Sequence, residues 1–253
     1  MILAILQARY SSSRLPKKVL KPILGKPMLF HQIQRLQNSK LIDDLVVATS
    51  TSSSDDPIEN MCLENNINLF RGNLENVLDR FYQCAKRYNP DYIVRLTGDC
   101  PLIDWKVVDQ TIEFFLDGNY DFAETSLKYP DGLDTEIMTM QSLKRAWENA
   151  ELPSEKEHVT QFIVNRADEF HNGILEPNHD MTHMRWTVDE PEDFMFVEKI
   201  YQALYAKNPF FLTEDILNLL KKKPKLIKIN NKFIRNEGLE KSLVEDKDYL
   251  KDV

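Results

Sequence analysis

Apolar residues follow two alternating patterns through the first half of the chain. Short continuous apolar runs, with the length of a buried strand, alternate with stretches in which apolar residues recur every three or four positions, as in a helix. The runs lie at residues 1–8, 42–50, 67–72, 91–99 and 121–126, and the helical stretches at 26–39, 58–66, 73–89 and 105–119. This alternation predicts an α/β fold with a doubly wound, mostly parallel sheet, in which ligands bind beyond the carboxyl ends of the strands.

The pattern changes after residue 125. Residues 129–140 have the pattern of a turn and a strand, 141–150 and 155–167 that of helices, and 184–205 that of a strand leading through a turn into a long helix. No element is assigned to the polar segment 225–250. We expect one domain over residues 1–253, made of a βα core (1–125), an inserted segment (126–183), and a return strand, helix and tail (184–253).

The charges are unevenly distributed along the chain. The net charge is −8, yet the first 42 residues contain eight Lys or Arg and no acid, and the first carboxylate is Asp43. The first strand-to-helix loop holds several of these basic side chains together with three serines, and such a loop near a helix start binds anions well. The acidity of the remainder argues against nucleic acid as a partner. We therefore expect a local site for one small phosphorylated ligand.

Several other classes of protein are disfavoured. Neither GxxxxGK[ST] nor GxGxxG is present, which disfavours P-loop ATPases and Rossmann dehydrogenases. The three cysteines are widely spaced, which indicates a reducing, cytoplasmic location, and the apolar runs are too short for a membrane span or a secretory leader. The segment "HDMTH" spaces His179 and His183 like a zinc-protease helix, but it runs straight into a strand-like segment, so no zinc site is expected.

Motifs along nearly the whole chain resemble those of enzymes that activate sugars with a nucleotide. "ARYSSSRLPKKVL" followed by "ILGKPML" is similar to A-R-x-G-S-[ST]-R-L-P-G-K and G-K-P of the spore-coat polysaccharide biosynthesis protein F family. It is also similar to cytidylyltransferases that make CMP-linked 2-keto sugar acids. The resemblance continues through "FRGNLENVLDRFYQCA", "RLTGDCPLID", "PDGLDTEIM", "EKEHVT", "RWTVDEPEDFMFV" and "IRNEG". Ser11 and Lys17 stand where the family usually has Gly.

The resemblance implies a nucleotide site, with CTP as the favoured triphosphate. Arg9, Ser12, Arg14 and Lys18 would hold the triphosphate, and Arg14 and Lys18 would offset the charge of the departing pyrophosphate. Arg80 is expected near the base or ribose, with an exposed helix face as the alternative. The full nucleotide-binding set is Leu6, Ala8, Arg9, Ser12, Arg14, Lys18, Arg71, Arg80, Thr97 and Asp99.

The same resemblance implies a metal site and an acceptor site. Asp99 and Asp189 would bind Mg²⁺, which prefers one or two carboxylates plus phosphate oxygens. The alternatives are a turn cap before Pro101 for Asp99 and a helix N-cap for Asp189. The acceptor would meet residues for which ordinary loop and cap roles are nearly as well supported, namely Asp134, Glu136, His158 and Arg185.

Two functions remain open. The first is a CTP-dependent nucleotidyltransferase in which Arg14, Lys18 and Asp99 are catalytic. It would activate a sugar or 2-keto sugar acid for surface polysaccharide, through an anomeric hydroxyl or a sugar phosphate. The second is a glycosyltransferase-like or non-catalytic module of the same fold that binds a nucleotide sugar, although no D-x-D motif occurs at Asp99. A homodimer is expected, with its interface in the inserted segment.

Overall fold

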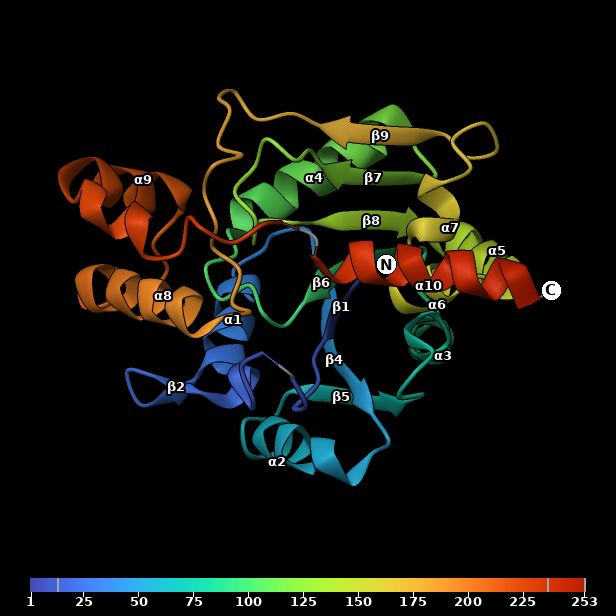
Figure 1. Ribbon diagram of the computed structural model, residues 1–253, viewed down its shortest axis with the longest axis horizontal. Helices are drawn as coiled ribbons and strands as arrows, with labels where there is room; N and C mark the ends of the chain where they lie inside the picture. Colours follow the sequence, from blue (N-terminus) through green and yellow to red (C-terminus); the bar gives the residue numbers. More distant parts are fainter. Residues whose placement is uncertain (13, 236, 253) are drawn as a thin grey trace.

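A seven-stranded sheet forms the centre of the protein, seen in a computed structural model that describes residues 1–12, 14–235 and 237–252. Its strand order is β5-β4-β1-β6-β8-β7-β9, and only β8 runs antiparallel to its neighbours (Figure 1). The strands are β1 (Ile2–Gln7), β4 (Asp44–Ser50), β5 (Asn68–Gly72), β6 (Tyr92–Thr97), β7 (Phe122–Thr125), β8 (Glu136–Thr139) and β9 (Asn172–Leu175). The predicted α/β class with a mostly parallel sheet is confirmed.

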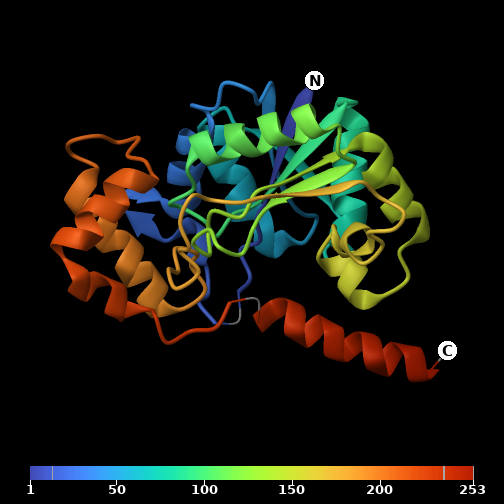
Figure 2. The same ribbon diagram turned by 90° about the horizontal axis from the view of Figure 1, so that it is seen from above.

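Helices cover both faces of the sheet, as the views in Figures 1 and 2 show. The helices of the described residues are α1 (Met28–Leu36), α2 (Asp56–Glu64), α3 (Val77–Tyr88), α4 (Trp105–Gly118), α5 (Met140–Asn149), α6 (Pro153–Glu157), α7 (Gln161–Val164), α8 (Pro191–Leu204), α9 (Thr213–Lys222) and α10 (Glu237–Asp252). A small hairpin of β2 (Pro22–Ile23) and β3 (Lys26–Pro27) precedes α1, and three 3-10 turns occur at Lys18–Leu20, Ser53–Asp55 and Pro224–Ile229.

Strand β1 shows how the sequence produces the two-sided core. Successive side chains of a strand point to opposite faces of the sheet. Ala4 and Leu6 therefore enter one apolar cluster with α1, α4 and α8, whereas Leu3 and Ile5 enter a second cluster with α3 and α5. All four side chains are fully buried. A run that is apolar at every position is what a parallel strand covered on both faces requires.

The structure differs from the sequence prediction in the second half of the chain. The expected helix over 155–167 is broken into α6 and α7, because Val159 between them has a left-handed φ of 59°. The expected strand at 184–188 is wrong, since only one bridge, between Asp131 and Arg185, forms there. Strand β9, helix α9 and helix α10 lie in segments to which no element was assigned.

Helix α10 lies outside the layered body and packs mainly on α6 (Figure 2). Its buried residues are polar: Ser242 is 2% exposed and Asp246 is 6% exposed. The Asp246 carboxylate accepts hydrogen bonds from the Ser154 backbone N–H at 2.9 Å and from the Ser154 hydroxyl at 2.6 Å. The helix is therefore attached to the body through polar contacts and not through an apolar core.

Candidate active site

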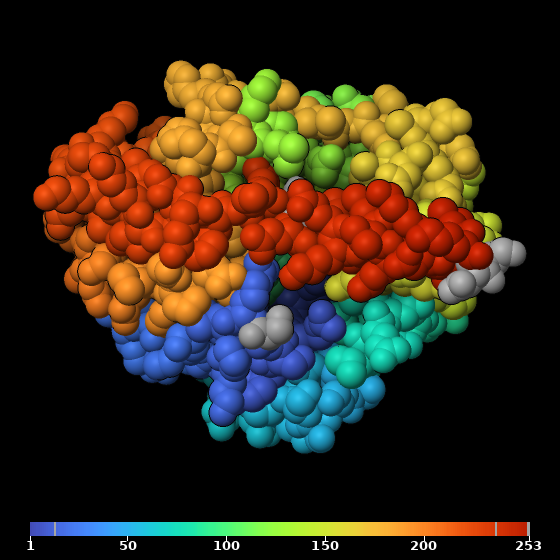
Figure 3. All heavy atoms as spheres, viewed as in Figure 1, coloured from blue at the N-terminus to red at the C-terminus, as the bar shows by residue number. Residues whose placement is uncertain are grey.

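Two adjoining cavities lie beyond the carboxyl ends of β1 and β6. The basic cavity, of about 310 Å³, is lined by five Lys or Arg and three Asp or Glu; the acidic cavity, of about 620 Å³, is lined by four Lys or Arg and eight Asp or Glu. Helix α10 crosses this face of the molecule and contributes to both linings (Figure 3). The two cavities share Arg14, Thr97, Asp99, Asp189 and Gly238.

The parallel pairing of β1 and β6 brings Asp99 to the basic first loop. Gln7 lies opposite Thr97 in register, and the Gly98 backbone N–H donates to the Gln7 carbonyl at 2.7 Å. A Cβ at Gly98 would lie 3.0 Å from both the Ala8 Cβ and the Gln7 carbonyl oxygen, so only glycine permits this approach without a shift. Because both strands end at the same edge, Asp99 faces the loop that begins at Ala8.

Lys18 links the two carboxylates that were predicted to bind a metal. Its ammonium lies 2.9 Å from Asp99 Oδ2 and 2.8 Å from Asp189 Oδ1. Burial raises the pKa of Asp99, but Lys18 more than offsets this and lowers it to about 2, whereas the two carboxylates raise the pKa of Lys18 despite its own burial. The Asp99 carboxylate is thus ionised at neutral pH, and it converges with Asp189 on one cation. The backbone N–H of Val188 donates to the Asp99 carbonyl at 2.8 Å, which fixes the segment before Asp189 beside Asp99.

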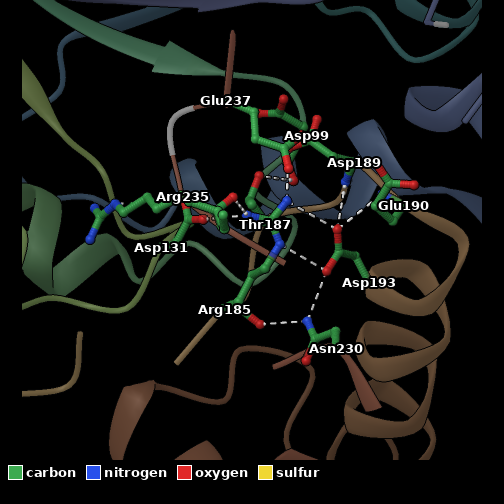
Figure 4. Close-up of polar contacts among 12 residues, drawn as sticks. Asp99, Asp131, Arg185, Thr187, Asp189, Glu190, Asp193, Asn230, Arg235 and Glu237 are labelled. Carbon is green, nitrogen blue, oxygen red and sulfur yellow. Dashed lines mark hydrogen bonds and ion pairs between the residues drawn. The ribbon is translucent and has the colours of Figure 1, made fainter. Parts of the chain in front are cut away.

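Arg185 holds the segment that carries Asp189 (Figure 4). Its side chain is 6% exposed, and it forms ion pairs with Asp131 at 2.7 Å, Asp189 at 3.0 Å and Asp193 at 3.0 Å. Asp193 is fully buried and also accepts from the Asn230 side-chain amide at 2.9 Å. Arg185 lines the acidic cavity, but its guanidinium is engaged by these three carboxylates and so holds Asp189 in place.

Arg14 lies where the two cavities meet. Its guanidinium is 3.0 Å from Asp189, 3.6 Å from Glu190 and 2.7 Å from Glu237 of α10. A cation shared by three partly exposed carboxylates can exchange them for phosphate oxygens without losing charge pairing.

The basic cavity contains a buried guanidinium with few partners. Arg80 of α3 is fully buried, so the exposed helix face considered for it is excluded. It donates one hydrogen bond to the Asn73 carbonyl at 2.8 Å, and within the described part of the chain its Nε and Nη2 have no partner. Burial, with help from Arg9, lowers the pKa of Arg80 to about 10. Polar ligand atoms would compensate these unsatisfied donors.

The first loop reproduces with lysine a backbone conformation that glycine usually supplies. Lys17 has φ 62° and ψ 19°, in the left-handed region, and its N–H donates to the Tyr10 carbonyl at 3.2 Å. A non-glycine residue in this region costs about 1 kcal/mol. Lys17 therefore adopts the left-handed conformation itself, at a position where the family usually has glycine. Ser11 and Ser12 line the basic cavity, and the Ser12 hydroxyl accepts from the Leu15 N–H at 3.4 Å.

All four predicted acceptor residues line the acidic cavity, and each has hydrogen-bond or ion-pair partners. Glu136 accepts two hydrogen bonds of 2.8 Å from Arg95 Nη1. Asp134 pairs with Arg235 and accepts from the Gly132 N–H at 2.8 Å. His158 Nε2 lies 3.0 Å from the Ser242 hydroxyl of α10, and burial lowers its pKa. Arg185, the fourth, forms the cluster described above.

Two residues of the predicted nucleotide set line neither cavity. Leu6 is fully buried in the core of the sheet. Arg71 lies at the end of β5, where its guanidinium donates to the Ser50 carbonyl at 2.9 Å and the Ser52 carbonyl at 2.7 Å and pairs with Asp56 and Glu59. The other members, from Ala8 to Asp99, line the basic cavity.

Asp99 and Asp189 are suitable ligands for a hard divalent cation. Two protein carboxylates would leave most of its coordination positions to the substrate. Within the described residues no group of three or more His, Cys, Asp or Glu side chains is arranged to hold a metal. Asp99 and Asp189 do converge on one point, which the Lys18 ammonium takes. Mg²⁺ is commonly bound by one or two carboxylates together with phosphate oxygens and water.

The residues that sequence reasoning missed come from two sources. Glu124 of β7 lines the acidic cavity. The sequence feature that could have indicated it is a carboxylate inside the short strand "FAET". Glu237 and Lys241 come from α10, in the polar segment 225–250 to which no element was assigned. None of the helices in the described part of the chain combines the length and apolarity needed to cross a membrane.

This fold and these paired cavities define a nucleotidyltransferase. The family model for cytidylyltransferases matches residues 3–222, and the chain belongs to that family. It is 32% identical to the spore coat polysaccharide biosynthesis protein SpsF of Bacillus subtilis, over 88% of this chain and 95% of that one. It is 36% identical to an uncharacterized protein of Methanocaldococcus jannaschii, over 91% and 94%. A solved cytidylyltransferase from Leptospira borgpetersenii superposes with a TM-score of 0.85 at 31% identity, over 89% and 96% of the two chains.

Proposed function

We propose that this protein transfers CMP from CTP to a sugar-type acceptor for the synthesis of a surface polysaccharide or glycan. The observation that carries the proposal is the meeting of a basic and an acidic cavity at Arg14, Asp99 and Asp189. The triphosphate belongs in the basic cavity and the acceptor in the acidic one. The shared residues then lie between the α-phosphorus and the nucleophile. The family to which the chain belongs and its identity to SpsF support this assignment.

The nucleotide would be bound by four basic residues, namely Arg9, Arg14, Lys18 and Arg80. Arg9, Arg14 and Lys18 supply positive charge to the triphosphate, and Arg80 has free donors that can meet the ribose or the base. Asp99 and Asp189 would hold Mg²⁺, which supplies charge neutralisation to the phosphates when it is bound. Lys18 then has to move from between the two carboxylates toward the phosphate oxygens.

The reaction needs no covalent enzyme intermediate. The acceptor oxygen attacks the α-phosphorus in line, forming a new P–O bond, while the bond from that phosphorus to the bridging oxygen breaks and pyrophosphate leaves. An attacking hydroxyl releases its proton to solvent, whereas an attacking sugar phosphate has none to lose. Arg14 and Lys18 stabilise the negative charge on the leaving group, and positioning supplies much of the remaining acceleration.

Calorimetric titration with CTP, ATP, GTP and UTP, each with and without Mg²⁺, tests the proposed nucleotide site. Binding that is selective for CTP and strengthened by Mg²⁺ is the expected result. Release of pyrophosphate from CTP in the presence of acceptor then separates catalysis from the alternative, a non-catalytic or glycosyltransferase-like module. Binding of a nucleotide sugar without binding of any triphosphate would favour that alternative.

We also propose that the protein is a homodimer with an interface built from the segment 126–183. The support is the resemblance of its motifs to those of the cytidylyltransferases, which implies a dimer interface in this segment. Sedimentation equilibrium at micromolar concentration tests it, and a single monomeric species would contradict it.

A further inference from the structure

Three charged residues lie side by side across three neighbouring strands in the wall of the acidic cavity. Arg95 of β6 is in register with Glu136 of β8, and Glu136 is in register with Glu124 of β7. All three side chains line the cavity. The row therefore contains two carboxylates and one guanidinium. Arg95 Nη1 donates to both oxygens of Glu136 at 2.8 Å, so the single positive charge of the row is committed to Glu136.

Glu124 is left as a carboxylate without a partner. No hydrogen bond or ion pair to its side chain occurs in the described part of the chain. Burial and the neighbouring carboxylates of Glu136 and Asp134 raise the pKa of Glu124 to about 7, more than Arg95 and Arg235 lower it. Like charges directly opposite each other on paired strands destabilise a sheet. Such a pair inside a cavity lowers the stability of the folded protein, and a local loss of stability of this kind is typical of a binding site.

The other cations around this cavity are also paired. Arg235 is bound to Asp134, and Arg185 is enclosed by Asp131, Asp189 and Asp193. At the rim, Lys128 pairs with Glu176 at 3.1 Å. Arg14, at the junction with the basic cavity, pairs with Asp189, Glu190 and Glu237. A carboxylate on the acceptor would therefore meet only guanidinium groups that already pair with carboxylates, and it would face Glu124. A protonated amino group would complete the row of alternating charges that Arg95 begins.

We propose that the acceptor is a hydroxylated compound with a basic amino group and no carboxylate, and that Glu124 binds the ammonium of that amino group. This inference rests on the proposed transfer of CMP, and it narrows the acceptor to amino sugars and amino polyols. Glu136, held by Arg95, forms the second side of the same subsite. Recognition of an ammonium by a partly buried carboxylate also makes an N-acetylated analogue a poor ligand, because acetylation removes the charge.

The test compares sugars that carry an amino group, an N-acetyl group or a carboxylate. D-glucosamine, N-acetyl-D-glucosamine and D-glucuronic acid form one set; galactosamine, its N-acetyl form and galacturonic acid form a second, and 3-deoxy-manno-octulosonate is added as a 2-keto sugar acid. Each is titrated into the full chain saturated with CTP and Mg²⁺, with binding followed by NMR chemical shifts and turnover by pyrophosphate release. The amino members are expected to bind at least tenfold more tightly than their acetylated or acidic partners.

Glu124→Gln tests the residue. This substitution keeps the shape and removes the charge, so it is expected to abolish the preference for amino over N-acetyl probes while CTP affinity stays within twofold. Glu113→Gln, an identical change on the exposed face of α4, is the control and keeps the preference. Tighter binding of any acidic probe, absence of binding by every amino probe, or an unchanged preference in Glu124→Gln would each overturn the proposal. Failure of CTP itself to bind would instead refute the proposed function.

Discussion

Glu237 in the first turn of α10 accepts a 2.7 Å hydrogen bond from the Arg14 guanidinium. This contact joins the C-terminal helix to the loop that we assign to the triphosphate, so α10 and the nucleotide compete for one cation. The rest of the attachment is polar and small, since α10 packs mainly on α6 through Ser242 and Asp246. Such an attachment can be released by a few kcal/mol of ligand binding energy.

Glu237→Gln is therefore expected to strengthen CTP binding. The ion pair is partly exposed, with side chains 31% and 34% accessible, so its loss frees about 1 kcal/mol, which corresponds to roughly a fivefold lower Kd. Calorimetry at constant ionic strength measures the change. Glu240→Gln, a neighbouring exposed position on α10 outside both cavity linings, is the control. Weaker CTP binding in Glu237→Gln would instead show that Glu237 contacts the bound nucleotide favourably.

Asp99→Asn is expected to remove metal-dependent turnover while leaving the protein folded. The substitution keeps the size of the side chain but takes away one of the two carboxylates that converge on the proposed cation position. We expect pyrophosphate release to fall at least 10²-fold, by analogy with the loss of other electrostatic contributors to catalysis. The exposed Asp117→Asn on α4 is a charge-matched control. Near-normal activity with a normal melting temperature would refute the metal assignment.

Arg185→Met is expected to destabilise the protein strongly. It would leave Asp193 fully buried and paired only with neutral donors, and breaking a buried charge cluster by removing one partner costs about 3–5 kcal/mol. Urea unfolding followed by circular dichroism measures this change. The double variant Arg185→Met, Asp193→Asn should recover part of the stability, because it removes the orphaned charge. If the single variant loses activity but keeps its stability, Arg185 acts on substrate rather than on Asp189.

The sheet and half of the site could be predicted because their causes are local. Apolar runs of strand length alternate with helical stretches, and parallel strands end at one edge, which brings Asp99 to the first loop. The rest depends on tertiary pairing. Strand β8 enters between β6 and β7 and runs antiparallel to both, which aligns Arg95, Glu136 and Glu124. No local pattern in any one of these strands specifies that alignment.

Helix α10 could not be predicted for a different reason. It buries Ser242 and Asp246 and exposes Leu243 and Leu250, which is the reverse of the pattern expected for a helix on an apolar core. Arg71 is a different case. The resemblance implies a nucleotide contact for it, whereas in the structure its guanidinium donates to the carbonyls of Ser50 and Ser52.

The unpaired state of Glu124 also predicts how stability depends on pH. Its pKa is raised to about 7 in the folded protein, above the ordinary value of 4.5, so between these values the folded state binds more protons than the unfolded state. Stability therefore falls as pH rises from 4.5 to 7, and Asp131, with its pKa also raised to about 7, acts in the same direction.

Glu124→Gln removes the Glu124 contribution to this pH dependence. We expect its melting temperature to exceed that of the wild type by roughly 3 °C at pH 8 and to equal it at pH 4.5. Differential scanning calorimetry at several pH values measures this difference. A melting temperature below that of the wild type at pH 8 would mean that the Glu124 carboxylate is stabilised by contacts that the glutamine cannot make.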